Sequence, residues 1–356
     1  MMRISAVICE LNPAHEGHKY IFDRARECGD VVVAVMSGNF VQRGENAIFD
    51  KYKRAGSALE IGADVVLELP FPWSCASAQY FAVAAVHIAE SVGCTDLVFG
   101  SESGNIDALK KAALLLSGEL FNSAIPGDER AAEYRERLLY ELDPSLPEGI
   151  LSRANDILGV EYIKNLKNAE AHPIRRISCH SASSIRAEMK DNRSQFGDAV
   201  FYDRLTELIF NRLRCDSKPD FATAEAAGGV GMRLYKAAFD SKNGEEMIAA
   251  SATKQYTNAR LKRCGLYYLT DVKRTDLQAM PLFSTVLGFN KKGREYLSSI
   301  RKRSSLELIT KPASVKGLAA DVKTQADKNS FADSIYALIS NRSADCFIKC
   351  GPVIKE

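Results

Sequence analysis

Short apolar runs alternate with amphipathic stretches along the first half of the chain. Apolar positions recur at helical spacing in the amphipathic stretches, at residues 18–27, 50–61, 77–92, 106–117 and 129–141, and again from Ser183 onward. Buried strands of parallel sheets carry near-continuous apolar sequence. Runs of this kind occupy residues 4–9, 31–36, 65–69, 96–100 and 174–179. This alternation predicts an α/β fold with a doubly wound parallel sheet, in which ligands bind beyond the carboxyl ends of the strands.

The second half of the chain has a different pattern. Helical spacing is evident at residues 201–213, 232–239 and 245–264, without the earlier alternation with apolar runs. The composition changes in the polar stretch at residues 191–197, which we take as a domain boundary. The sequence therefore predicts an α/β domain over residues 1–192 and a mainly helical domain over residues 193–356.

Charge is spread unevenly over the chain. The net charge of the 356 residues is only +2, yet residues 251–312 contain thirteen Lys or Arg against four acids. An excess of positive charge in one region predicts a polyanionic partner for that region. A set of solvated helix faces is the alternative explanation for the same charges.

The cysteines and the apolar segments indicate the compartment. Nine cysteines are irregularly spaced without a Cys-x-x-Cys pair, which argues against a zinc framework and fits a reducing compartment. The first apolar run is too short for a signal peptide. No apolar run approaches the roughly 18–20 residues of a membrane helix. We therefore expect a cytoplasmic protein that does not use a membrane.

The strongest chemical signal directly follows the first apolar run and reads ELNPAHEGH. Asn12 and Pro13 predict a turn, and Gly17 permits close approach of a ligand to the backbone. The helix that begins behind the turn offers free N–H groups, which favour phosphate. His15 and His18 share one face of this helix. They can donate hydrogen bonds to α-phosphate oxygens, on which charge grows during nucleophilic attack.

A second signal follows the fifth apolar run and reads SASSIR. Ser183 or Ser184 can cap the helix that begins there, and Arg186 adds a guanidinium to the free N–H groups. Together these groups predict a second anion site, suited to β- and γ-phosphates. The two motifs in this order assign His15, His18 and Arg186 to catalysis.

The histidine motif and SASSIR together resemble the HIGH-type nucleotidyltransferases. More specifically, the chain resembles the tRNA(Met) cytidine acetate ligase family. The stretches that carry this resemblance read ELNPAHEGH, MSGNFVQRGE, AIFDKYKRA, GADVVLELP, FGSE, NDILGVEYIK and SASSIR, with QYTNARLKR and VLGFNKKGRE in the second half. They cover nearly the whole chain. Ala14 and Asp156 depart from the residues that are usual in the family at their positions.

The resemblance implies a Rossmann-like, ATP-binding catalytic domain and a two-step reaction. ATP and acetate would form acetyl-adenylate with release of pyrophosphate, and the acetyl group would then pass to N4 of the wobble cytidine of elongator tRNA(Met). Mg²⁺ is expected to accompany ATP and to be held mainly by its phosphates. The ATP contacts that the family implies are Val7, Ile8, Cys9, Glu10, Leu11, Asn12, Pro13, Gly17, Tyr20, Gly100, Asn155 and either Arg175 or Arg176.

Two further groups of residues complete the predicted site. The stretch MSGNFVQRGE follows the second predicted strand, at the ligand edge of the sheet, and its polar groups can bind a carboxylate. Its predicted substrate residues are Ser37, Gly38, Asn39, Gln42 and Arg43. Basic residues of the C-terminal region can bind tRNA phosphates. They form two clusters, namely Lys254, Arg260, Lys262 and Arg263, and Lys291, Lys292, Arg294, Arg301, Lys302 and Arg303.

Other interpretations fit parts of the sequence. A cofactor-type adenylyltransferase acting on a small phosphorylated substrate fits the first half but leaves the basic second half without a partner. A non-catalytic tRNA-binding protein predicts binding without adenylate formation. His15 and His18 also suit a zinc hydrolase, but no third ligand is evident. Asp50, Lys51 and Arg54 lie at helical spacing and fit structural ion pairs as well as a substrate site.

Overall fold

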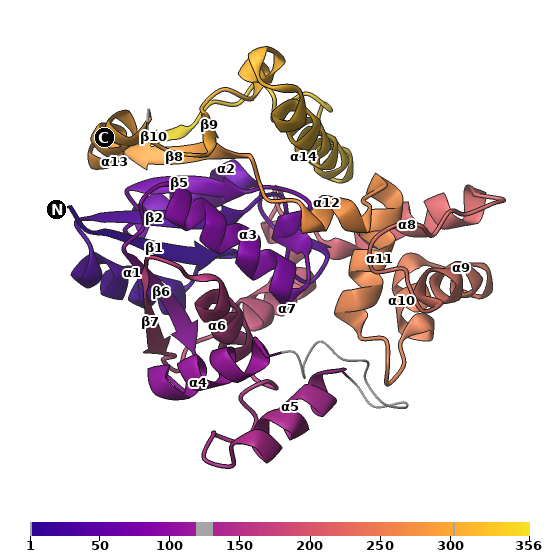
Figure 1. Cartoon of the computed structure of the whole chain (residues 1–356). Coiled ribbons are helices and arrows are strands. Elements are labelled where there is room, and N and C mark those ends of the chain that lie inside the picture. Colours follow the sequence, from indigo (N-terminus) through magenta and orange to yellow (C-terminus); the bar gives the residue numbers. More distant parts are fainter. Residues whose placement is uncertain (1, 119–130, 302) are drawn as a thin grey trace.

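The computed structural model describes residues 2–118, 131–301 and 303–356 (Figure 1). The strands of its main sheet are β1 (Ile4–Cys9), β2 (Val31–Ser37), β5 (Val65–Leu69), β6 (Asp96–Ser101), β7 (Glu170–Arg175), β8 (Phe283–Asn290), β9 (Glu307–Ile309) and β10 (Val353–Lys355). Their order is β10-β8-β5-β2-β1-β6-β7, and β9 pairs with β8. Neighbouring strands are parallel, apart from β5 and β8, which are antiparallel.

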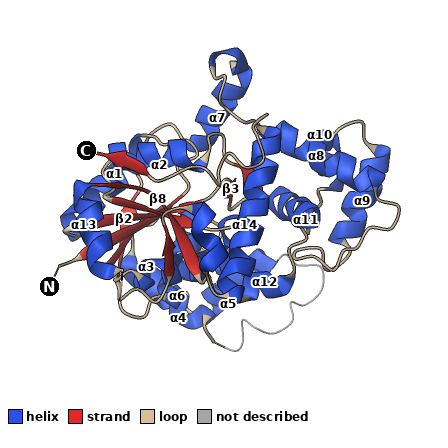
Figure 2. Cartoon of the chain, turned by 90° about the horizontal axis from the view of Figure 1, so that it is seen from above, coloured by secondary structure: helices blue, strands red, loops and turns tan. Residues whose placement is uncertain are grey.

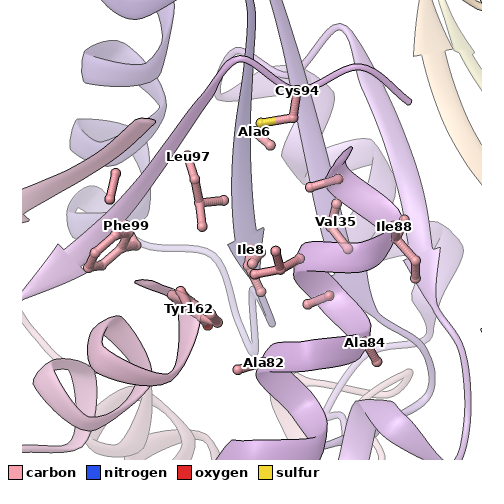
Figure 3. Close-up of a cluster of buried hydrophobic side chains, with 14 of the residues drawn as sticks. Ala6, Ile8, Val35, Ala82, Ala84, Ile88, Cys94, Leu97, Phe99 and Tyr162 are labelled. Atoms are coloured by element: carbon pink, nitrogen blue, oxygen red, sulfur yellow. The ribbon is translucent and has the colours of Figure 1, made fainter. Parts of the chain in front are cut away.

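Helices cover both faces of this sheet, because successive side chains of a buried strand point to opposite faces. In β1, Ile4, Ala6 and Ile8 pack against one helical layer, whereas Val7 and Cys9 pack against the other. Figure 3 shows part of the first of these cores. The first layer contains α3 (Ala78–Ser91), α4 (Ile106–Leu116) and α6 (Ala154–Asn165), and the second contains α1 (Glu16–Cys28) and α2 (Lys51–Glu60). The predicted doubly wound α/β fold is confirmed.

A block of helices lies beside the sheet rather than over either face (Figure 2). It consists of α8 (Tyr202–Cys215), α9 (Val230–Asp240), α10 (Gly244–Ser251), α11 (Asn258–Thr270) and α12 (Arg274–Gln278). These helices share a core that includes Leu205, Leu234 and Tyr267. The continuous helix predicted over residues 245–264 is wrong, because α10 ends before Thr257, whose side chain caps the start of α11.

The chain after α12 returns to the sheet. β8 pairs with β5 and carries β9 and β10 with it, so residues 283–356 are not simply part of a helical domain that begins at residue 193. The apolar pattern of β8 is interrupted by Ser284 and Thr285, both buried, and Ser284 donates to the carbonyl oxygen of Glu68 at 2.7 Å. Two helices accompany these strands, α13 (Lys291–Ile300) and α14 (Ala320–Ile339).

The fifth parallel strand lies earlier than predicted. β7 occupies residues 170–175 instead of 174–179, and most of its side chains are only partly buried because it forms an edge of the sheet. An edge strand tolerates Pro173, whose missing N–H would break a ladder inside a sheet. The segment after β7 is therefore a loop that leads into α7 (Ala182–Asp191).

The described chain also contains the short 3-10 helices η1 (Trp73–Cys75), η3 (Arg193–Gln195) and η4 (Pro312–Gly317). The remaining strands and α-helix of the described chain are the hairpin strands β3 (Phe40–Val41) and β4 (Glu45–Asn46) and the helix α5 (Ala131–Leu142). The helix predicted to begin at residue 129 thus has its first two residues outside the described part of the chain. In the described ranges, no helix combines the length and the apolar composition needed to cross a bilayer.

Candidate active site

A cavity of about 510 Å³ lies at the carboxyl ends of β1 and β6 and reaches α11 of the helical block. This is the edge of the sheet at which the fold predicts ligand binding. The residues predicted for ATP and catalysis that line it are Val7, Ile8, Cys9, Glu10, Asn12, His15, Gly17, His18, Tyr20, Gly100, Asn155, Arg175, Arg176, Ser183 and Arg186. Leu11 is instead fully buried in the second sheet core, and Pro13 and Ser184 are absent from the cavity lining.

The two histidines meet at the start of α1. His15 is the N-cap of this helix, and its Nδ1 accepts a hydrogen bond from the backbone N–H of Gly17 at 3.0 Å. The rings of His15 and His18 have centroids 3.9 Å apart. A Cβ at Gly17 would lie 2.9 Å from the His15 ring and 2.9 Å from Sγ of Cys179, so only glycine fits this contact. Both imidazoles are thereby fixed at the cavity wall.

Both imidazoles are held in the neutral form. Burial, the neighbouring His15 ring and the charge of Arg176 lower the pKa of His18 to about 3. Burial and Arg176 also lower the pKa of His15. Since Nδ1 of His15 accepts a hydrogen bond, the neutral ring carries its proton on Nε2, which donates no hydrogen bond to the described residues. Nδ1 of His18 is buried without a hydrogen-bond partner among the described residues.

Arginines surround the histidines. Arg186 of α7 donates to the backbone oxygen of Asn12 at 2.5 Å and thus ties α7 to the turn that follows β1. Arg176 lies 3.5 Å from the carboxylate of Glu102 and lowers the pKa of both histidines. Arg175 also lines the cavity. Because Arg176 is the one that acts on the imidazoles, we propose Arg176 rather than Arg175 as the nucleotide contact on β7 and its following loop.

The start of α7 differs in detail from the prediction. Ser181, and neither Ser183 nor Ser184, is the N-cap, and it accepts a hydrogen bond from the N–H of Ser184 at 3.1 Å. Ser183 lies in the first turn, where its hydroxyl accepts from Arg186 at 3.3 Å. The helix tip therefore still presents a hydroxyl and a guanidinium to the cavity, as expected of an anion site.

Asn155 lines the cavity from the first turn of α6 and is tied to the loop that follows β6. Its side-chain amide donates to Glu102 at 2.7 Å, and the same carboxylate accepts from the N–H of Asp156 at 2.9 Å. Asp156 is fully buried, and its carboxylate accepts from the N–H groups of Glu102 and Ser103 at 3.0 and 3.1 Å. The departure from the family at Asp156 therefore serves to fix this loop.

Three of the five predicted substrate-loop residues do not line the cavity. Ser37, Gly38 and Asn39 are buried at the end of β2. The amide of Asn39 donates to Asp333 at 2.8 Å and accepts from the N–H of Lys51 at 2.8 Å, so it fastens α14 to α2. The prediction used polar type and position after a strand, but the amide of Asn39 is already occupied by Lys51 of α2 and by Asp333 of the distant α14.

The other two substrate-loop residues, Gln42 and Arg43, do line the cavity. The N–H of Gln42 donates to Oε1 of Glu10 at 2.9 Å, which holds the loop against the end of β1. Arg43 is exposed, and no ion pair joins it to an acid among the described residues. Gly44 has φ +74°, and its backbone packs so closely on Arg263 that a Cβ would lie 2.5 Å from the N of Arg263.

The first basic cluster lies beside the cavity but is partly neutralised. Lys262 pairs with Glu45, and Arg263 pairs with Glu225 at 3.2 Å. Arg260 lies 3.6 Å from the same Glu225 carboxylate. Arg263 is only 8% exposed and, with Ala259, contributes the α11 part of the cavity wall. Lys254 of the same cluster also has an interaction partner.

The second basic cluster lies at the opposite end of the sheet. β8 runs antiparallel to β5, and Phe289 pairs with Val65, so α13 begins at the amino ends of the parallel strands. Lys291, Lys292 and Arg294 therefore lie at this end of the sheet. Arg301 and Arg303 follow directly after the same helix. Lys302 lies outside the described residues. The two clusters predicted to bind tRNA together are thus on different sides of the fold, because the order of strands in space differs from their order in sequence.

Comparison with known proteins identifies the family. The HIGH Nucleotidyl Transferase family model matches residues 2–197 and 180–346. A tRNA(Met) cytidine acetate ligase of Thermoanaerobacter sp. (strain X514) is 31% identical, with 96% of this chain and 97% of that protein aligned. The chain belongs to the tRNA(Met) cytidine acetate ligase family. Another ligase of this name, from Caldicellulosiruptor saccharolyticus, is 35% identical over 87% of each chain.

Solved structures of this ligase family share the whole fold. The crystal structure of Thermotoga maritima TmcAL bound with alpha-thio ATP matches with a TM-score of 0.90 and 28% sequence identity, over 99% of each chain. The apo form of the same protein matches with a TM-score of 0.91 and 27% identity. The agreement extends over both the sheet and the helical block, because nearly all of each chain is superposed.

The metal-hydrolase interpretation finds no support at the ligase cavity. Among the described residues, one cluster could supply three metal ligands, namely Asp96, Glu170 and His172. Asp96 and Glu170 begin β6 and β7, at the end of the sheet opposite to the cavity. His15 and His18 belong to no such cluster in the described ranges, so a zinc ion there would lack a third protein ligand.

Several cavity residues of this ligase were not singled out from the sequence. Tyr162 and Glu45 lie within stretches that carry the family resemblance, which was the available signal. Cys179 has its Sγ 3.9 Å from Nδ1 of His15, and nothing in the sequence marked it. Arg263 was assigned to tRNA from charge alone, and its place in the cavity wall depends on how α11 docks.

Proposed function

We propose that the protein is an ATP-dependent tRNA(Met) cytidine acetate ligase. In the first step acetate and ATP form acetyl-adenylate and pyrophosphate. In the second step the acetyl group passes to N4 of the wobble cytidine of elongator tRNA(Met). The observation that carries this proposal is the pair of neutral imidazoles at the tip of α1, which line one cavity together with Arg176 and Arg186, in a chain of this ligase family.

The chemistry of the first step fits this arrangement. An oxygen of acetate attacks the α-phosphorus of ATP, and the bond from that phosphorus to the leaving pyrophosphate breaks. Negative charge grows on the non-bridging α-phosphate oxygens, where a fixed N–H donor stabilises the transition state. Nε2 of His15 is such a donor, and the unpartnered Nδ1 of His18 is the kind of buried polar atom that a ligand would satisfy.

The remaining cavity groups divide between the two ends of ATP. The guanidinium groups of Arg176 and Arg186 and the tip of α7 suit the β- and γ-phosphates. Gly100, at the end of β6, lets a flat base approach the backbone. The acids that line the cavity are Glu10 and Glu45, and neither belongs to a three-ligand cluster in the described residues. A Mg²⁺ ion would thus be held mainly by the phosphates.

The tRNA is proposed to approach from the side of the helical block. Arg43 and Arg263 line the cavity where it meets this block, and Arg260 and Lys262 lie on the same helix as Arg263, so a nucleotide that enters there would have its phosphates close to these cations. The second basic cluster, which begins with α13 at the other end of the sheet, is not proposed to contact the tRNA in this approach. A cofactor-type adenylyltransferase acts on a small substrate, so it does not need a basic surface that binds a polyanion at the cavity mouth.

Acetate-dependent exchange of pyrophosphate into ATP tests the first step, and mass analysis of tRNA nucleosides tests the second. We expect exchange with acetate and N4-acetylcytidine in elongator tRNA(Met). Exchange that requires a phosphorylated mononucleotide instead of acetate would contradict the proposal and support a cofactor-type adenylyltransferase. Binding of tRNA without any exchange would indicate a non-catalytic protein.

A further inference from the structure

Glu10 is a carboxyl group in a cavity that must accept anions. It stands directly after β1 and lines the cavity together with one other acid, Glu45. Glu45 is neutralised by its ion pair with Lys262. Glu10 has no ion pair with a basic residue among those that the structure describes. A free carboxylate repels both acetate and triphosphate, so the first step of the reaction gives no reason for an acid at this position.

The position of Glu10 points to the second step. Its Oε1 accepts from the N–H of Gln42 at 2.9 Å, so the carboxyl group is anchored to the loop that carries Arg43. That loop packs through Gly44 on Arg263 of the helical block. The carboxyl group therefore lies on the side of the cavity where a tRNA base is proposed to enter. Its other oxygen, Oε2, accepts no hydrogen bond from the described residues.

The surroundings of Glu10 suit a base. Burial raises the pKa of Glu10 above the usual range, which increases its basicity, while the hydrogen bond from Gln42 and the charge of Arg186 act in the opposite direction. A base is efficient when its pKa lies near the working pH and its carboxylate is still ionised. The N4 amino group of cytidine is a weak nucleophile, because its lone pair is delocalised into the ring, so it gains from proton removal during attack.

We propose that Glu10 is the general base of acetyl transfer, an inference that rests on the proposed function. N4 of cytidine attacks the carbonyl carbon of acetyl-adenylate, and a C–N bond forms. The bond between that carbon and the phosphate oxygen breaks, and AMP leaves with the electron pair. Oε2 of Glu10 takes the proton that N4 loses and later releases it to solvent. The products are N4-acetylcytidine and AMP, with Glu10 restored.

If Glu10 only anchored the loop, its replacement by glutamine would have little effect on acetyl transfer. The variant Glu10→Gln therefore separates a structural role from the role of a general base. A glutamine oxygen still accepts the hydrogen bond from Gln42, so the loop keeps its anchor, but an amide takes up no proton at neutral pH. Glu10→Asp keeps a carboxylate one methylene further back. Glu16→Gln, which removes an exposed charge in the first turn of α1 outside the cavity lining, is the matched control.

Three readouts on the full-length variants test the proposal. Acetate-dependent pyrophosphate exchange reports adenylate formation. Hydroxylamine, a strong nucleophile that needs no protein base, traps acetyl-adenylate as acetohydroxamate. Mass analysis reports N4-acetylcytidine in tRNA. For Glu10→Gln we expect acetylcytidine formation to fall by about 100-fold or more, since a general base typically contributes about 100- to 10,000-fold. Exchange and hydroxamate formation should fall by a much smaller factor.

The possible outcomes are distinct. A selective loss of acetyl transfer in Glu10→Gln, partial activity in Glu10→Asp and normal transfer in Glu16→Gln support the assignment. Parallel loss of exchange and transfer in Glu10→Gln, or transfer that is unchanged, overturns it. If Glu10→Gln does not fold, Glu10→Asp must still lose more transfer than exchange. Absence of acetate-dependent exchange in the unmodified protein would instead contradict the proposed function.

Discussion

Lys51 of α2 donates a hydrogen bond to the carboxylate of Asp333 on α14 at 2.6 Å, across 282 positions of sequence. The same ammonium group donates to Glu68 of β5 at 2.8 Å, and Lys51 is only 1% exposed. Asn39 joins the group by donating to Asp333. This buried cluster, made of Lys51, Glu68, Asp333 and Asn39, joins α14 to α2, to β5 and to the loop that follows β2.

Replacement of Lys51 by Met should destabilise the fold strongly. The change leaves the carboxylates of Glu68 and Asp333 buried side by side without a cation, and breaking a buried ion pair in this way costs about 3–5 kcal/mol. The measurement is the free energy of unfolding from urea denaturation. Lys53→Met on the same helix is the control, since Lys53 is about half exposed and pairs with Asp198 at the surface. A loss below about 1 kcal/mol for Lys51→Met, equal to that of the control, would contradict the cluster's role.

Removal of the His18 imidazole should slow adenylate formation. A fixed donor to a transition-state oxyanion contributes about 2.7–4 kcal/mol, so His18→Ala should reduce acetate-dependent pyrophosphate exchange by about 100–1000-fold. Binding of tRNA should persist. His180→Ala provides the control, because His180 is exposed and does not line the cavity. An equal loss of tRNA binding in His18→Ala would show that the variant is misfolded rather than catalytically impaired.

His18 should also make stability depend on pH. Its pKa is about 3 in the folded protein, against an ordinary value of about 6.5, so below pH 6.5 the unfolded chain binds a proton that the folded protein does not. The free energy of unfolding must therefore decrease as the pH falls from 6.5 toward 3. At pH 5 the contribution of His18 is at most about 2 kcal/mol.

Urea denaturation at pH 7.5 and pH 5 measures this effect. The unmodified protein should lose more stability between the two conditions than His18→Gln, whose amide does not titrate in this range. Other acid-sensitive groups contribute to both proteins and cancel in the difference. Equal losses in the two proteins would show that His18 is readily protonated in the folded state, in conflict with its neutral role at the α-phosphate.

Affinity for tRNA should depend more on Arg43 than on the second basic cluster, which begins with α13. Arg43→Ala removes an exposed cation at the cavity, and loss of one phosphate contact should weaken binding at all salt concentrations and reduce the slope of log K against log salt by about 1. Lys292→Ala removes an exposed cation at the opposite end of the sheet and serves as the control. Filter binding across a salt series measures both. A larger effect of Lys292→Ala would place the tRNA on the other side of the molecule.

Much of the part of the cavity that is proposed to bind ATP was predictable from sequence. The apolar run of β1 and the turn at Asn12 and Pro13 are local features, and a helix N-terminus directly after a buried strand lies at the ligand edge of a parallel sheet. These local features are sufficient to place His15 and His18 together. Ser181 was harder to identify, because the serines of SASSIR all have the chemistry of an N-cap and backbone geometry decides among them.

The strand β8, with which the chain returns to the sheet, could not be predicted from local sequence features. Its sequence places Ser284 and Thr285 among apolar residues, and their polar atoms are satisfied only by partners brought from elsewhere in the fold, such as the carbonyl oxygen of Glu68. The role predicted for Asn39 failed for the same reason, because its partners also come from distant segments. Its amide looked available for substrate, yet Asp333 and Lys51 occupy it.

The sequence by itself determined the doubly wound sheet, the paired histidines at the tip of α1 and the serine-rich start of α7, because each depends on residues within one strand–turn–helix unit. Tertiary structure alone decided that Glu10 is hydrogen-bonded to Gln42, that α13 places its cations away from the cavity, and that Asp333 of α14 pairs with Lys51. These features depend on contacts between segments far apart in the chain. Periodicity and local propensity describe a segment's own conformation and carry no information about which distant segment will pack against it.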